Sequence, residues 1–169
     1  GDFVSGIYAM DYAQDKKNIA LSFSRDGNVR QDQFRIAKSI QIKESQSIMV
    51  DYALQGEFSG LFAIEMNISL LGSPHALIRM GTEYLDIRNT GTREHIDAFN
   101  LADRFLNMKI AFKFSEPITV WYYPVETVSL SEQGIERLYQ GTSFLFVSRV
   151  ALNGMKKLAL TMDFEEDMT

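Results

Sequence analysis

The stretch Phe62-Ala63-Ile64-Glu65-Met66-Asn67-Ile68-Ser69-Leu70 alternates without a break between large apolar side chains and small or polar ones. Successive side chains of a β-strand point to opposite faces of a sheet, so a period of two predicts a half-buried strand. We therefore expect a strand at residues 62–70, with Glu65 and Asn67 side by side on its polar face. The ordinary role of such a face is contact with solvent.

The same alternation recurs along most of the chain, at residues 19–23, 34–42, 48–54, 110–114 and 158–164. Together with apolar runs at residues 4–12, 118–123 and 144–147, this gives about nine or ten strands. No helix of ten or more residues separates successive runs, which argues against parallel βαβ units. We predict an all-β protein, an antiparallel β-sandwich in one domain spanning residues 1–169.

Local turn signals predict how the strands connect. Arg25-Asp26-Gly27-Asn28 predicts one hairpin, because Asp-Gly readily supplies the positive φ of a tight turn. Asn153-Gly154 predicts a second hairpin, which pairs the run from Phe144 with the run that ends at Phe164.

One short helix is expected near residues 130–139. Ser129 and Glu132 have the spacing of a capping box, and Gly141 is a natural helix end. Ile135, Leu138 and Tyr139 then share one helical face.

Composition limits the classes of function. The chain has 169 residues, of which 46% are hydrophobic, and a net charge of -5. No apolar run is long enough for a membrane span and no basic stripe is present, so we expect neither membrane nor nucleic-acid partners. The absence of cysteine is compatible with a cytoplasmic location, which we expect. Because Gly1 opens the chain in place of methionine, we interpret it as a tag scar on a fragment of a larger protein.

The sequence contains few candidates for catalysis. His75 and His95 are its two histidines, and His95 with Asp97 supplies only two of the three or more donors of a metal site. No Gly-x-Ser-x-Gly elbow is present. We therefore expect no metal, no cofactor and no catalytic residue in this chain.

The aromatic run at residues 118–123 leaves two interpretations open. Trp121 and Tyr123 share one face of this strand, and Val120 and Tyr122 share the other, so both faces are apolar. That pattern favours a strand covered on both sides and a buried Trp121. The alternative is an exposed aromatic platform for a sugar.

The segment from Pro117 to Gly134, PITVWYYPVETVSLSEQG, continues with Glu136-Arg137 and Tyr139-Gln140-Gly141. It resembles a signature of the C-terminal β-sandwich of family 57 glycoside hydrolases, which include 4-α-glucanotransferases and certain α-amylases. The resemblance extends over residues 100–164 and, more weakly, 61–70. It implies a galactose-mutarotase-like sandwich.

In that family the catalytic glutamate and aspartate lie on an N-terminal barrel, to which the resemblance does not extend. It therefore implies a non-catalytic domain whose partners are the barrel of its parent chain and an α-glucan or maltooligosaccharide. The carbohydrate-binding residues that we expect are Glu65, Asn67, Trp121 and Tyr123. One alternative is a stand-alone carbohydrate-binding module. A less favoured one is a mutarotase-like sugar epimerase, which would need an acid and a base from His75, His95 and Glu65.

Overall fold

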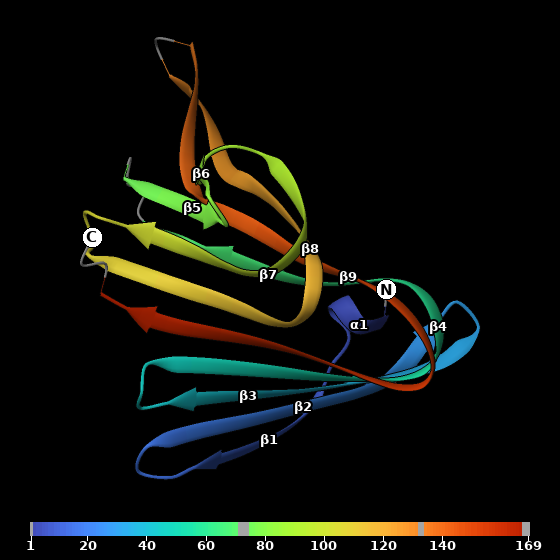
Figure 1. Ribbon diagram of the computed structural model, residues 1–169. Coiled ribbons are helices and arrows are strands. Elements are labelled where there is room, and N and C mark those ends of the chain that lie inside the picture. Colours follow the sequence, from blue (N-terminus) through green and yellow to red (C-terminus); the bar gives the residue numbers. More distant parts are fainter. Residues whose placement is uncertain (1, 71–74, 132–133, 167–169) are drawn as a thin grey trace.

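The computed structural model describes residues 2–70, 75–131 and 134–166. Among these residues, nine strands form one antiparallel sheet in the order β1-β2-β3-β4-β9-β8-β7-β5-β6 (Figure 1). The elements are α1 (Asp2–Ser5), β1 (Ala9–Gln14), β2 (Asn18–Val29), β3 (Asp32–Lys43), β4 (Ser47–Ile68), β5 (Ala76–Met80), β6 (Glu83–Asp86), β7 (Gly91–Asp103), β8 (Met108–Ser131) and β9 (Gly134–Glu165).

The sheet folds back on itself to make two facing layers. Phe112 of β8 pairs with Met162 of β9, yet its ring centroid lies 5.8 Å from that of Phe146, much earlier in β9. A straight strand would hold Phe146 and Met162 roughly 50 Å apart. β9 must therefore double back, and Figure 1 shows β4 turning with it. The predicted antiparallel sandwich is confirmed, with long strands shared by both layers.

The two layers differ in width. The small layer contains only residues 57–68 of β4, 134–152 of β9, 119–131 of β8 and 91–96 of β7. The large layer contains β1, β2, β3, β5 and β6 whole, with residues 47–56 of β4, 154–165 of β9, 108–114 of β8 and 98–103 of β7. β1, β2 and β3 therefore extend beyond the β4 edge of the small layer.

Phenylalanine rings fill the space between the layers. Phe99 and Phe112 of the large layer stack at 4.5 Å, and Phe146 of the small layer lies 5.0 Å from Phe114. Of the apolar residues predicted for the strand at 62–70, all but the first pack against this core, and Phe62 packs against a second cluster around Leu54. Glu65 and Asn67 face away from the core and are exposed. The period-two interpretation of this stretch is confirmed.

The prediction of a helix near residues 130–139 is wrong. β8 and β9 form a two-stranded hairpin there, which projects from the body in Figure 1 and in which Leu130 pairs with Ile135. An isolated helix of about ten residues is only marginally stable, while Thr127, Val128 and Ile135 are β-branched and suit a strand. Glu132, the second half of the expected capping box, lies outside the described residues.

Both predicted hairpin turns also differ from the structure. Asp26 and Gly27 lie inside the paired part of β2, and the chain turns later, at Arg30, whose φ is 61°. Asn153 and Gly154 do mark a reversal of the chain, but the two halves of β9 do not pair with each other. Instead, Gly154 pairs with Gly56 while the whole β4–β9 ladder bends.

Candidate functional site

The four residues proposed for carbohydrate binding share the outer face of the small layer. Glu65 of β4 pairs with Leu145 of β9, which pairs in turn with Trp121 of β8. In the next row but one, Asn67 pairs with Ser143 and Ser143 with Tyr123. Residues directly opposite each other in a ladder project from the same face. The structure thus brings all four predicted residues together.

Trp121 is partly open to solvent, contrary to our preferred interpretation. Its exposed fraction is 42% and that of Tyr123 is 38%, whereas Val120 is fully buried. The inner face of this strand is covered by the large layer, and no other described part of the chain covers the outer face. A strand that is apolar on both faces here carries an exposed pair of aromatic side chains.

Hydrogen bonds hold the carboxylate beside this pair. Asn67 Nδ2 donates to Glu65 Oε1 at 3.3 Å, and Ser143 Oγ donates to the same oxygen at 3.5 Å. Ser143 is only 1% exposed and lies between Asn67 and Tyr123. Sequence reasoning missed it, because a serine in an apolar strand becomes informative only when its partners across the sheet are known.

The arrangement offers two kinds of contact to a ligand. Trp121 and Tyr123 lie about 7 Å apart along β8 and expose parts of flat apolar rings that also carry hydrogen-bonding groups. The Glu65 carboxylate accepts hydrogen bonds, and the Asn67 amide both donates and accepts them. These features suit a flexible, hydroxyl-rich molecule with apolar faces better than a compact ion.

The two histidines do not join this surface. His75 is exposed in the turn before β5, and His95 is exposed on β7 at an irregular pairing with β8, with a φ of 58°. In the described ranges, no three His, Cys, Asp or Glu residues gather closely enough to hold a metal ion. None of the described helices has the length and apolar character to cross a membrane.

A second polar cluster, which sequence reasoning missed, fastens the irregular part of β8 to β9. Glu116 accepts a hydrogen bond from Ser148 Oγ at 2.6 Å and from Lys156 Nζ at 2.8 Å. Burial acts to raise the pKa of Glu116, but these two bonds outweigh it and hold the pKa below its ordinary value. A carboxylate occupied in this way stabilises the fold and is poorly suited to proton transfer.

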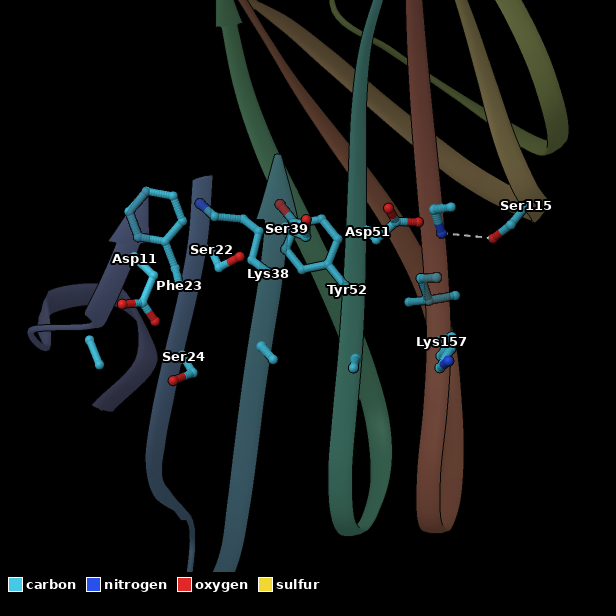
Figure 2. A pocket seen from close by; sticks show the side chains of 15 residues that line it. Asp11, Ser22, Phe23, Ser24, Lys38, Ser39, Asp51, Tyr52, Ser115 and Lys157 are labelled. Atoms are coloured by element: carbon cyan, nitrogen blue, oxygen red, sulfur yellow. Dashed lines mark hydrogen bonds between the residues drawn. The ribbon is translucent and has the colours of Figure 1, made fainter. Parts of the chain in front are cut away.

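The outer face of the large layer carries a shallow hollow of about 370 Å³ (Figure 2). Many of the side chains along it are short, among them Ala9, Ser22, Ser24, Ala37, Ser39, Ala53 and Ala159. One cross-strand row along the hollow runs from Asp11 through Ser22 and Ser39 to Asp51 and on to Ala159. Figure 2 shows Ser115 at one side, where its Oγ accepts a hydrogen bond from the Ala159 amide at 2.9 Å. The hollow offers a low-relief contact surface.

The fold places the chain among galactose-mutarotase-like sandwiches. It matches the crystal structure of a mutarotase-type protein from Salmonella typhimurium with a TM-score of 0.70 at 12% identity, over 94% of this chain and 65% of that one. Such low identity establishes the likeness of the fold alone.

The comparison with protein families identifies the chain more specifically than the likeness of fold does. Residues 1–162 match the family described as alpha-amylase/4-alpha-glucanotransferase, C-terminal, and the chain belongs to it. The 4-alpha-glucanotransferase of Thermococcus kodakarensis is 26% identical over 85% of this chain and 19% of its own length. The alpha-amylase of Pyrococcus abyssi is 28% identical over 98% of this chain and 22% of its own length. The chain thus spans about a fifth of the length of these curated relatives.

Proposed function

We propose that this chain is a non-catalytic domain of an α-glucan-acting enzyme of the family 57 type, and that it binds α-glucan through the outer face of its small layer. The observation that carries the proposal is the grouping of Glu65, Asn67, Trp121 and Tyr123 in nearby cross-strand rows. Family membership supports the choice of α-glucan as the ligand.

The chemistry of the surface fits a maltooligosaccharide. Each glucose ring has apolar C–H faces that can lie against an indole or phenol ring, and hydroxyls at its edge. Trp121 and Tyr123 supply exposed aromatic surface, and Glu65 with Asn67 supplies hydrogen-bonding groups beside it. Ser143 keeps the Glu65 carboxylate beside the platform.

The non-catalytic part of the proposal rests on the carboxylates. Glycoside hydrolysis uses two carboxyl groups on either side of the scissile bond. The described hydrogen bonds join Glu65 to Asn67 and Ser143 and to no second acid. We expect the isolated chain to release or transfer no glucose units from maltooligosaccharides. A turnover that persists through purification and is lost in Glu65→Gln would contradict this.

We also propose that the domain packs on the catalytic barrel of a longer, cytoplasmic parent chain. The hollow on the outer face of the large layer supports this, because its short side chains let another layer approach closely. The relatives support it by length, since about four fifths of each lies outside the matched part.

The test of glucan binding uses the single tryptophan as its probe. Titration with maltoheptaose should change Trp121 fluorescence with a saturable curve, and Tyr123→Ala and Glu65→Gln should each weaken binding about tenfold. Tyr12→Ala is the matched control, because Tyr12 is an exposed tyrosine on β1, in the large layer. Fluorescence that stays constant through the titration would overturn the proposed glucan site.

A stand-alone carbohydrate-binding module is the second candidate, because the same exposed aromatic pair supports it. The two candidates differ in what accompanies the domain. A reading frame that encodes a βα barrel upstream of Asp2 would support the enzyme domain, and a gene without one would support the module.

A further inference from the structure

We propose that the small layer is completed by an extended strand from another part of a longer family polypeptide, added along the edge of β4 at residues 57–68. This inference rests on the proposed function only for the source of the strand. It concerns the gap between the layers and does not involve the Trp121 surface.

β4 loses its partner on one side where the ladder bends. Residues 47–56 pair with β3 on one side and β9 on the other, and the last pair with β3 joins Phe34 to Gly56. Residues 57–68 pair with β9 alone within the described chain. A free edge of this length presents a row of backbone donors and acceptors and is a template for another strand.

An apolar hollow of about 390 Å³ lies beside this edge. It is lined by Phe34 and Tyr52 of the large layer, Phe58 and Phe62 of β4, and Phe3 and Tyr8 of the N-terminal segment. Burial raises the pKa of Tyr52 to about 12, with a smaller contribution from Tyr8, so its phenol remains neutral. The hollow can therefore receive the alternate apolar side chains of an added strand.

The inner face of the large layer also carries apolar side chains of β1 that are largely exposed in the described part of the chain. Met10 and Tyr12 of β1 are 61% and 59% exposed, and they pair with Phe23 and Leu21 of β2. These side chains lie on the same face as Tyr52, which packs against the core. A strand added beside β4, at a spacing of about 4.8 Å, would extend the small layer toward this surface.

The free edge determines the chemistry of the partner. Backbone donors and acceptors that alternate at strand spacing are matched by an extended polypeptide, and not by a glucan or a lipid. Polypeptide for this role exists in related proteins. Only 19% of the length of the Thermococcus kodakarensis relative is matched by this chain, and 65% of the mutarotase-type structure. The rest of each protein is polypeptide that this chain does not match.

The experiment uses overlapping synthetic peptides that cover the unmatched part of the Thermococcus kodakarensis relative. At least one peptide should bind this chain and slow amide exchange of residues 57–68 about tenfold. N-methylation of alternate amides in that peptide should abolish binding, because the bond is made by the main chain. Phe58→Ala and Phe62→Ala, which remove rings that line the hollow beside this edge, should weaken binding, and the control Met155→Ser, at an exposed position near the bend, should not.

Three results would overturn the inference: no peptide that slows exchange at residues 57–68, equal binding of the N-methylated peptide, or a dimer of this chain that protects the same amides. The dimer would assign the edge to a second copy. Trp121→Phe should leave peptide binding unchanged, so failure of the glucan site and failure of this inference are distinguishable.

Discussion

Gly56 and Gly154 face each other across β4 and β9, and both have φ values that only glycine adopts readily, +141° and +118°. The ladder doubles back at this pair, and the residues on either side of it belong to different layers. The two-layer architecture, and with it the outer face that carries Trp121, therefore depends on two glycines.

Alanine at these two positions should destabilise the protein unequally. Gly154→Ala should cost about 1–3 kcal/mol from backbone strain alone, because nothing lies within 4 Å of its added Cβ. Gly56→Ala should cost more, since its Cβ would meet the Gln33 carbonyl oxygen at 2.7 Å. Urea unfolding of both variants measures the difference. Equal losses would show that the close approach to Gln33 has no energetic consequence.

The Glu116 cluster should make stability depend on pH. The pKa of Glu116 is lower in the folded chain than its ordinary value, so its stabilising effect is complete above that ordinary value and is lost as the pH falls through the lowered one. Glu116→Gln should reduce the free energy of unfolding by about 1 kcal/mol at neutral pH and have less effect in acid. The check is urea unfolding at both pH values, with Glu57→Gln as an exposed control. A loss that is equal at both pH values would contradict the charged interaction.

Thr142 is fully buried at the base of the projecting hairpin. Its Oγ1 donates to the Ile87 carbonyl at 2.7 Å and lies 2.7 Å from the Tyr139 hydroxyl. Thr142→Val keeps the shape but leaves both partners unsatisfied, so it should cost about 1–3 kcal/mol. Thr92→Val, at an exposed position of β7, should change stability by less than about 0.5 kcal/mol. Thermal unfolding of the two variants should separate them, and equal midpoints would mean that the buried hydroxyl contributes nothing.

The alternation of apolar and polar residues predicted much of this fold, because it depends on a local property. That property is the face of the sheet to which each side chain points. The alternation identified the polar face of Glu65 and Asn67 and the apolar face that packs on the phenylalanine core. It also placed Trp121 and Tyr123 on one face. The sequence could not show that strands far apart in the chain align these four residues, because register is decided by pairing across the sheet.

The failures have a common physical cause. Whether a face is covered depends on the opposite layer, and no local pattern shows that the large layer covers only the inner face of the strand at Trp121. The helix predicted near residues 130–139 failed for a related reason, since its capping signals were local and the pairing of Val128 with Arg137 and of Leu130 with Ile135 was not visible. Ser143 and Glu116 were missed because their importance comes from partners on other strands.

The projecting hairpin should tolerate polar substitutions. Leu130 is 84% exposed and Ile135 is 74% exposed. They pair with each other in the part of the hairpin that lies beyond the last residue pair between β8 and β7. Leu130→Ser and Ile135→Ser should each change the free energy of unfolding by less than about 0.5 kcal/mol. Phe146→Ala, in the core, should cost about 3–5 kcal/mol. Urea unfolding compares them, and a large loss in either hairpin variant would show that these side chains are covered in solution.

The position of Trp121 gives a direct optical prediction. Because its side chain is 42% exposed on the outer face, its emission should lie toward the longer wavelengths of a hydrated indole, and acrylamide should quench it readily. Tyr122→Trp in a Trp121→Phe background moves the indole to the buried face, where Tyr122 is 3% exposed, and should give blue-shifted emission that resists quenching. Blue-shifted, quencher-resistant emission from the unmodified chain would mean that the outer face is covered in solution, which would remove the basis for a glucan site there.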